Sequence, residues 1–277
     1  MTTPPVVAVP EIEAAGVRYA LVVKAWETAF FGRVFGTLAW QNGSDAGFPN
    51  AETAAALHRL CASADTAGFA VIECHLDVAD FAAAPVLESA GFRLVDSRIR
   101  FLTRWSAADI PETAPAAGRI LDVTPDHRSR IIALTHLGFT DNPGFVSRFK
   151  NTDFFTGEET RRYFEAWIDG SAFASDAVTA VYEVDGEVVG YYVYQVRGAN
   201  DGLAVVKGIL TSVAAEHRGS GAQLAMQTHL YRRLGLAEWY VDNTTQLTNL
   251  PVIRNHMQSG KRLEQIALTF YRAAATP

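Results

Sequence analysis

Apolar and polar positions divide the first part of the chain into short runs that alternate between two periods. Two apolar runs within 19–40 flank a short polar and aromatic stretch, which predicts strand, turn or helix, and strand. A helix is expected over 50–67, a strand over 69–76, another helix over 79–90 and a strand over 93–103. The glycine that follows each of these helices marks its expected end.

The second part continues this alternation and adds a hairpin. Asp185 and Gly186 separate two apolar runs, which is a strong signal for a two-residue hairpin turn. The stretch 140–157 is polar and aromatic without a regular period. The predicted strands are 120–123, 178–184, 187–196, 204–213, 238–241 and 263–272, and the predicted helices are 125–137, 158–171, the stretch after Gly221, and 249–259.

Shifts in composition indicate how the chain is organised. Residues 1–16 are rich in proline and predict an extended arm, and 106–118, rich in alanine and proline, predicts a linker. The halves 17–105 and 119–277 both mix strands with helices, so we expect an α/β protein. Each half ends in helix, glycine and strand, as LESAGFRLVDSRIRF and HMQSGKRLEQIALTF show. This weak repeat indicates either a duplication or a coincidence, because the unit is common.

Composition excludes several classes of protein. The 277 residues are 49% hydrophobic and 19% charged, which allows a large core. The formal net charge of −6 argues against nucleic acid as the main partner. Cys61 and Cys74 lack the spacing of a zinc site or disulfide framework, so we expect two buried thiols and no metal. The chain shows no signal-peptide pattern and no apolar run of about 18 residues, so we expect a cytosolic protein without a membrane partner.

The most informative chemistry lies in 208–230. Residues 209–213 end a predicted strand, 218–221 read Arg-Gly-Ser-Gly, and a helix follows. Backbone N–H groups gathered at a helix N-terminus favour a pyrophosphate, and glycine lets phosphates approach the backbone closely. No lysine follows Gly221 as a P-loop requires, and the third glycine of a dinucleotide fingerprint is missing. The alternative is an ordinary strand, turn and helix.

Two motifs resemble those of a known family. Arg218 and Gly221 fit (Arg/Gln)-x-x-Gly-x-(Gly/Ala), the acyl-CoA loop of the GNAT N-acetyltransferases, with Gln223 at its last position. A second GNAT motif, in the last helix, is matched at Asn249, while His256 stands where a tyrosine is usual. That motif's glycine is matched at 260, and a valine occupies its small position at 252. Similarity to the TDP-fucosamine acetyltransferases of enterobacterial surface-polysaccharide synthesis extends over 26–32, 87–92, 148–153, 163–167 and 245–272.

The resemblance implies a fold and an activity. The fold would be the GNAT fold, a mixed twisted sheet flanked by helices, with 119–277 as the catalytic domain and 17–105 as a degenerate GNAT-like half. Acetyl-CoA would be the acyl donor, and a small-molecule amine, first that of a nucleotide-linked amino sugar, would attack the thioester directly. An amino acid, a polyamine or an antibiotic remains an alternative acceptor. A non-catalytic CoA-binding sensor and a homodimer also remain open.

The same resemblance assigns the acyl-CoA site. The strand end, 209–213, would pair its backbone with the pantetheine amides, and the N–H groups of 219–224 would hold the pyrophosphate. Asn249 would either hold a pantetheine or diphosphate oxygen or cap the last helix. The expected cofactor-binding residues are Leu210, Thr211, Ser212, Val213, Arg218, Gly219, Ser220, Gly221, Ala222, Gln223 and Asn249.

Acyl transfer to an amine leaves two proton transfers to assign. His256 is the expected catalytic acid for the departing thiolate, because an imidazolium donates a proton near neutral pH. The alternative is that His256 only packs or hydrogen-bonds beside the sulfur. The base is open, because Asp153, Glu183 and Asp242 are candidates by residue type alone and a water chain would serve equally well.

The acceptor site has two groups of candidates. Arg148 and Lys150, in the irregular stretch, could bind an acceptor diphosphate, although an exposed surface pair is the simpler interpretation. Trp26, Phe30 and Phe31 could line an acceptor pocket, although aromatic residues belong more often to a core. Both assignments follow from residue type and position only.

Overall fold

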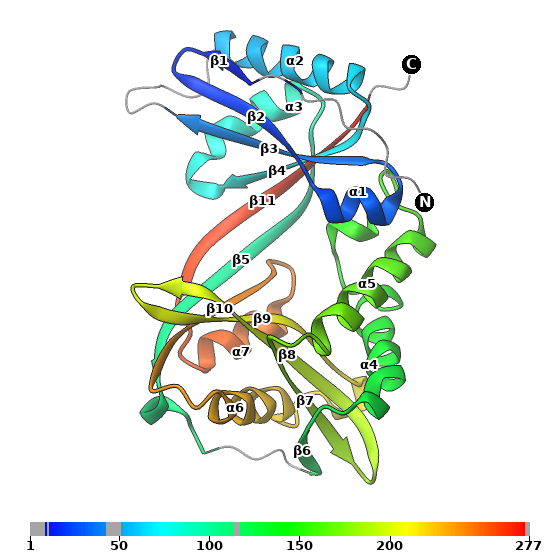
Figure 1. Cartoon of the computed structure of the whole chain (residues 1–277), viewed down its shortest axis with the longest axis vertical. Coiled ribbons are helices and arrows are strands. Elements are labelled where there is room, and N and C mark those ends of the chain that lie inside the picture. Colours follow the sequence, from blue (N-terminus) through cyan, green and yellow to red (C-terminus); the bar gives the residue numbers. More distant parts are fainter. Residues whose placement is uncertain (1–8, 10, 43–50, 113–116, 275–277) are drawn as a thin grey trace. The chain divides into compact units, whose positions relative to one another are not determined.

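The computed structural model describes residues 9, 11–42, 51–112 and 117–274 (Figure 1). Most of the expected arm, 1–16, the first residue of the helix expected from 50, and the middle of the expected linker, 113–116, lie outside the described residues. The chain forms two compact units. Unit 1 comprises Met1–Arg98, Ser147–Phe155 and Gln265–Pro277, and unit 2 comprises Ile99–Val146 and Thr156–Glu264.

Unit 1 is a mixed sheet with short helices. Its strand order is β1-β2-β3-β4-β11, in which β3 and β4 are parallel and the other neighbours are antiparallel. Its elements are β1 (Ile12–Ala14), β2 (Val17–Val23), α1 (Ala25–Phe31), β3 (Val34–Asn42), α2 (Ala51–Thr66), β4 (Phe69–Asp77), the 3-10 helix η1 (Val78–Ala83), α3 (Ala84–Ser89), the 3-10 turn η5 (Arg148–Lys150) and most of β11 (Leu263–Ala273).

The local signals in unit 1 are confirmed. Gly68 and Gly91 end their helices with φ of +84° and +85°, a conformation that glycine adopts without strain. The apolar face of α2 packs in a core that includes Leu57, Leu60 and Phe270. Cys61 and Cys74 are both buried in this core as free thiols, and burial raises the pKa of the Cys61 thiol to about 11.

Unit 2 contains a run of six neighbouring strands, in the order β5-β10-β9-β8-β7-β6. Within it, β9 and β10 are parallel, and β6 to β9 are joined as antiparallel neighbours. Its elements are β5 (Arg93–Ser106), η2 (Ala107–Asp109), β6 (Arg119–Asp122), η3 (Pro125–His127), α4 (Arg128–Thr135), the π-helical turn η4 (His136–Thr140), α5 (Gly157–Ala172), β7 (Ala177–Val184), β8 (Glu187–Asn200), β9 (Leu203–Val213), η6 (Ala215–His217), α6 (Ala222–Leu234), β10 (Glu238–Gln246) and α7 (Leu250–Gln258).

Helices cover both faces of the unit 2 sheet. Successive side chains of a strand point to opposite faces of the sheet, so Tyr191 and Tyr192 of β8 lie on different faces. The Tyr191 hydroxyl bonds to Thr135 of α4, whereas Tyr192 bonds through Tyr194 to Tyr231 of α6. Therefore α4 covers one face and α6 the other, and the core of unit 2 lies on both sides of β8.

Two expected elements differ in detail from the structure. The helix predicted over 125–137 is η3, α4 and the π-helical turn η4 in succession. Gly138 lies in that turn against Ser212, where an added Cβ would collide with the Ser212 hydroxyl, so the close approach to β9 requires a residue without a side chain. The strand predicted over 238–241 continues to Gln246, because its second part alternates buried and exposed residues although it is polar.

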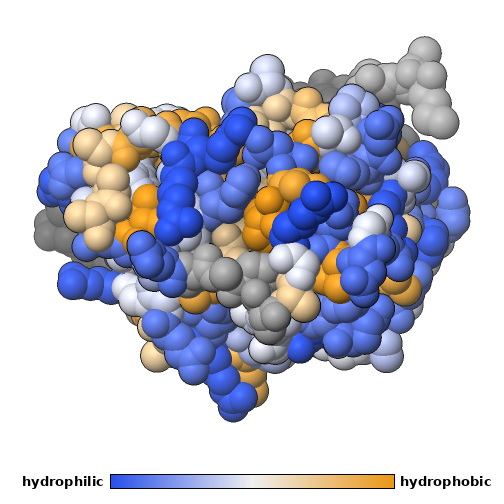
Figure 2. Space-filling view, turned by 90° about the horizontal axis from the view of Figure 1, so that it is seen from below, coloured by the Kyte–Doolittle hydropathy of each residue, from blue (hydrophilic) through white to orange (hydrophobic). Residues whose placement is uncertain are grey.

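In the view of Figure 2, hydrophobic residues appear as separate small areas among hydrophilic ones. Among the described residues, no helix combines the length and the apolar character needed to span a bilayer.

Candidate active site

The parallel strands β9 and β10 separate before they end. Their pairing stops at Lys207 and Asp242, although β9 continues to Val213 and β10 to Gln246. The other edge of β9 remains paired with β8 as far as Val213. The segment 208–213 therefore keeps its place in the sheet while its second edge is no longer paired with β10 among the described residues. A free strand edge of this kind can pair with an extended ligand.

An asparagine lies where the two strands begin to separate. The Asn243 side chain lies so close to Gly208 that a Cβ at that position would collide with Nδ2. Its Nδ2 donates to the Tyr192 hydroxyl at 3.2 Å, which in turn accepts a bond from Tyr194. Burial raises the pKa of both tyrosines well above the usual range, so both are neutral. The buried Oδ1 of Asn243 has no hydrogen-bond partner within the described part of the chain, so a donor from a ligand would satisfy it.

The glycine loop joins the free end of β9 to α6. Gly219 and Gly221 both have φ of +78°, and neither would place a Cβ against a neighbouring atom. In the described residues, the backbone N–H groups of 219–224 donate to no other part of the chain. They stand at the N-terminus of a thirteen-residue helix, where the helix dipole favours an anion. Arg218 adds positive charge nearby and donates from Nε to the carbonyl of Val213 at 3.0 Å.

Buried polar contacts join α6 to α7 and to the turn that follows it. Asn255 Nδ2 donates to Gln223 Oε1 at 2.7 Å, and one helical turn later Lys261 Nζ donates to Gln227 Oε1 at 2.9 Å. Lys261 Nζ also lies 3.0 Å from His256 Nδ1. Gln223 thus takes part in the contact between the helices. Its position in the glycine loop motif therefore also has a structural role.

His256 is enclosed on the inner side of α7. Its side chain is 3% exposed and packs against the edge of the Phe101 ring, with the ring centroids 5.1 Å apart. Burial, together with the neighbouring Lys261, lowers the pKa of His256 to about 2. The imidazole is consequently neutral near pH 7. The sequence predicted a charged imidazolium as the acid, whereas the buried ring is neutral and could donate a hydrogen bond only from that neutral form.

The remaining expected cofactor-binding residues lie along this segment. Thr211 Oγ1 donates to the Tyr191 carbonyl and Ser212 Oγ donates to the Leu134 carbonyl, so both hydroxyls are used within the sheet and α4. Ser220 Oγ donates to the carbonyl of His217, which closes the loop on itself. Leu210 and Ala222 are buried, and Val213 ends β9 opposite Gly190. Contacts from these residues to a ligand would come mainly from their backbones.

Asn249 begins α7 without capping it. The residue occupies the N-cap position, but its side chain makes no capping bond and Nδ2 donates to Thr245 Oγ1 at 3.1 Å. Asn249 therefore stands where a helix cap is expected, but its side chain does not act as one.

The three candidate bases are all held in ion pairs. Arg100 binds both carboxylate oxygens of Asp242 at 3.0 Å. Glu183 pairs with Arg119 between β7 and β6, and Asp153 of unit 1 pairs with Arg93. The structure gives none of them a contact with His256. A water chain thus remains the other candidate for the base.

Three buried polar residues of the site were missed by the sequence reasoning: Gln227, Asn243 and Lys261. Gln227 lies one helical turn after Gln223, and Lys261 directly follows the glycine of the last-helix motif. These positions, close to the two motifs, were the only features of the sequence that could have pointed to Gln227 and Lys261 as site residues. Burial itself had no local signal, because it depends on which elements pack together.

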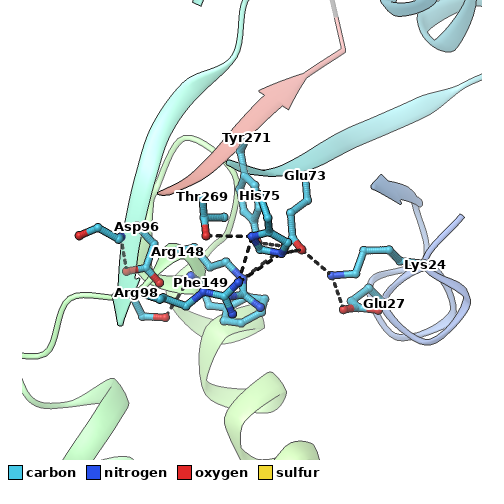
Figure 3. A network of polar contacts seen from close by, with 12 residues as sticks. Lys24, Glu27, Glu73, His75, Asp96, Arg98, Arg148, Phe149, Thr269 and Tyr271 are labelled. Carbon is cyan, nitrogen blue, oxygen red and sulfur yellow. Dashed lines mark hydrogen bonds and ion pairs between the residues drawn. The ribbon is translucent and has the colours of Figure 1, made fainter. Parts of the chain in front are cut away.

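A second polar cluster lies in unit 1, around Glu73 of β4 (Figure 3). Its carboxylate is 4% exposed and lies 3.2 Å from Lys24 Nζ, 2.5 Å from His75 Nε2 and 3.3 Å from Arg148 Nε. Burial alone would raise the pKa of Glu73, but Arg148, His75 and Lys24 together hold it well below the usual range. Arg148 is thus committed to an internal ion pair and stacks on Phe149, which weakens its candidacy as a diphosphate ligand.

The aromatic acceptor candidates form part of a ring cluster in unit 1. Phe31 contacts Phe35 and Phe155, with centroids 4.9 and 5.1 Å apart, and Trp26 stacks on Phe30. These contacts agree with the core interpretation for Phe31. The Trp26 side chain is about half exposed and lies at the edge of the cluster.

Comparison with known proteins identifies the fold. No protein-family model matches the chain, and no curated protein matches it in sequence. A GCN5-related N-acetyltransferase from Kribbella flavida has a TM-score of 0.56 at 14% identity, over 96% of this chain and 90% of that one. One from Sphaerobacter thermophilus has a TM-score of 0.53 at 14% identity, over 94% and 78%. A tandem GNAT protein from the clavulanic acid biosynthesis pathway has a TM-score of 0.54 at 14% identity, over 88% and 76%.

The similarity covers both units, because each alignment spans most of the chain. The predicted α/β fold is confirmed, whereas the finer resemblance to TDP-fucosamine acetyltransferases stays a prediction. Identities this low establish architecture and leave activity to be argued from the site. The chain has the fold of the GCN5-related N-acetyltransferases.

Proposed function

We propose that the protein is an acyl-CoA-dependent N-acyltransferase whose acyl-CoA site lies in unit 2. The observation that carries this proposal is the early end of the β9–β10 pairing at Lys207 and Asp242, directly before the glycine loop. One continuous segment, 208–224, then offers an unpaired strand edge followed by free N–H groups at a helix N-terminus. An extended amide chain that ends in a pyrophosphate, as in CoA, matches both features.

Each part of this segment has a proposed task. Acetyl-CoA, when bound, supplies a thioester that an amine can attack directly. The backbone of 208–213 pairs with the pantetheine amides, and the buried Oδ1 of Asn243 accepts from one of them. The N–H groups of 219–224 hold the pyrophosphate, with Arg218 adding charge. His256 donates a hydrogen bond to the departing sulfur from its neutral ring, since the pKa of His256 lies far below neutral pH.

The acceptor is proposed to be a small-molecule amine. The amine of a nucleotide-linked amino sugar is the first choice, and its support is the sequence resemblance. An amino acid, a polyamine or an antibiotic amine keeps the same chemistry with another acceptor. A non-catalytic CoA sensor is the non-enzyme alternative, and it is supported by Gln223 in the glycine loop motif and by His256 in the tyrosine's place. We also propose a cytosolic setting and a homodimer.

The first test is calorimetric titration with acetyl-CoA, followed by thiol release over a panel of amines that includes TDP-amino sugars. Binding and turnover on one amine would establish acyl transfer and name the acceptor. Binding without turnover across the panel would favour the sensor, and absence of binding would refute the acyl-CoA site.

A matched pair of variants tests the loop itself. Gly221 and Gly235 flank α6, both have positive φ, and neither has a neighbour that a Cβ would meet. Gly221→Val and Gly235→Val therefore introduce similar backbone strain, of roughly 1–3 kcal/mol, at opposite ends of one helix. We expect Gly221→Val to weaken acetyl-CoA binding at least about tenfold, because it alone crowds the phosphate cradle. Equal losses in both variants would attribute the effect to helix stability.

A further inference from the structure

Lys261 is a buried lysine with no anion among its hydrogen-bond partners. It follows Gly260, which has φ of +78° at the end of α7, and its side chain turns back between α7 and α6. Nζ donates to Gln227 Oε1 at 2.9 Å and lies 3.0 Å from His256 Nδ1. The three residues are 5%, 2% and 3% exposed respectively. Both partners of this amine are neutral groups.

The hydrogen-bond arithmetic fits an uncharged amine. A neutral lysine carries two N–H donors, and the structure supplies two acceptors, Gln227 Oε1 and His256 Nδ1. An ammonium would bring a third donor and a charge into a site with little solvent. Burial accordingly lowers the pKa of Lys261 well below its usual range.

The same contact bears on which nitrogen of His256 carries the hydrogen, because either Nδ1 accepts from Lys261 Nζ or a neutral Nζ accepts from Nδ1–H. The first arrangement uses both N–H donors of the neutral amine, and in it the ring hydrogen lies on Nε2. The groups that face the ring are Lys261 from the turn, Phe101 from β5 and, through Lys261, Gln227 from α6. Lys261 is the titratable group among them.

We infer that Lys261 is a positioning residue of the acyl-transfer site, which holds His256 as a neutral imidazole with its hydrogen on Nε2, ready to donate to the leaving sulfur. This inference rests on the proposed function. It adds that the neutral ring already carries the hydrogen that it offers to sulfur, so no acidic pH is needed for it to donate this hydrogen bond.

The reaction balances with this donor. Transfer forms a C–N bond and breaks the C–S bond, whose electron pair goes to sulfur. The nitrogen loses one proton to water, and the sulfur gains one from water after departure. Nε2–H stabilises the negative charge on sulfur by a hydrogen bond throughout and keeps its own hydrogen. Lys261 itself takes no part in these proton transfers, because burial lowers its pKa and keeps its amine neutral.

The test begins with wild-type protein labelled with ¹⁵N-histidine. Long-range ¹H–¹⁵N correlation spectra separate the two neutral forms of the ring and the charged form, and the signals that vanish in His256→Gln belong to His256. We expect His256 to be neutral with its hydrogen on Nε2 from pH 5 to pH 8. A ring that titrates near its ordinary pKa of about 6.5, or carries its hydrogen on Nδ1, would overturn the inference.

The variant Lys261→Met then removes the donor and keeps the length of the side chain. We expect the hydrogen of His256 to distribute over both nitrogens, and kcat to fall roughly tenfold with KM for acetyl-CoA little changed, because the donor is misoriented but present. Arg262→Met is the matched control, since Arg262 is adjacent, exposed and also positive. An unchanged His256 spectrum in Lys261→Met would overturn the inference, and the wild-type spectra decide it even if this variant fails to fold.

The spectra and the assay separate the two claims. Turnover with the wrong histidine form would overturn the role of Lys261 and leave acyl transfer standing. The expected form without turnover on any amine would overturn the proposed function, and with it the catalytic meaning of Lys261.

Discussion

At the scale of single residues, His256 shows how surroundings override residue type. An exposed histidine would share its proton with water near neutral pH, and that property suggested an acid. In the structure, burial and the neighbouring Lys261 lower its pKa to about 2, so the ring can act only as a neutral donor. The position that the GNAT motif gives to a tyrosine is thus filled by a buried ring that is also neutral.

His256→Phe tests whether that donor matters. We expect kcat for acyl transfer to fall about a hundredfold, because one hydrogen bond to a developing charge is lost, while the Kd for acetyl-CoA stays within about twofold. Stopped assays of thiol release and calorimetry measure the two quantities. His229→Phe, at a half-buried position of α6 where the histidine pairs with Asp122, is the control. Unchanged turnover in His256→Phe would remove His256 from the mechanism without excluding an enzyme.

The wild-type pH profile follows from the same pKa. His256 is neutral throughout the ordinary range, so its ionisation should contribute no fall in activity between about pH 8 and pH 5.

At the scale of elements, the separation of β9 from β10 is the feature on which the proposed acyl-CoA site depends. Asn243 stands at the point of separation against Gly208, and its amide is held by the hydroxyl of Tyr192. A wider residue at 208 would force this side chain out of place. The arrangement of the two strands therefore requires a glycine at 208 beside the amide side chain of Asn243.

A double-mutant cycle measures that match. We expect Gly208→Ala to lower the free energy of unfolding by about 1–3 kcal/mol, because its Cβ overpacks against Asn243. Adding Asn243→Ala removes the obstacle, so the double variant should be more stable than the sum of the single effects by at least about 0.5 kcal/mol. Urea unfolding of the four proteins gives the coupling. Strictly additive effects would contradict the contact.

At the scale of the whole molecule, each of the two units is built from segments that are not contiguous in the sequence. Residues 147–155 belong to unit 1 although both flanking stretches belong to unit 2, and β5 and β11 change units after Arg98 and Glu264. Glu73 accounts for part of this arrangement, because its buried carboxylate holds Arg148 of the inserted segment within unit 1.

Glu73→Gln tests both the cluster and the independence of the acyl-CoA site. The folded pKa of Glu73 is depressed, so its contribution to stability is present above its unfolded pKa of about 4.3 and is lost as pH falls through the lower folded value. We expect the variant to lose roughly 3–5 kcal/mol of stability at pH 7, with the difference from wild type shrinking below about pH 4. Glu88→Gln, exposed on α3, should show no such pattern.

The same variant should leave acetyl-CoA binding intact where it is folded, because the proposed site lies wholly within unit 2. A changed Kd at a temperature well below its unfolding midpoint would show that unit 1 contributes to the site.

Much of the local structure could be predicted because its causes are local. The hairpin at Asp185 and Gly186 has φ of +51° and +84°, which few residues other than Asp, Asn and Gly adopt readily. Gly221 opens α6 in the same way, and the apolar period of α2 matches the buried residues. These features depend on neighbours within one or two turns of chain, so the residues themselves carry the signal.

The sequence by itself determined the order of strands and helices, their glycine ends and the loop that suggested an acyl-CoA site. Only the tertiary structure decided where β9 and β10 part, which unit receives 147–155, and that Lys261 turns inward to His256. The physical reason is that pairing limits, burial and the pKa values that follow from burial arise between segments far apart in sequence. Alternation and propensity describe one segment at a time, and they do not specify its partner.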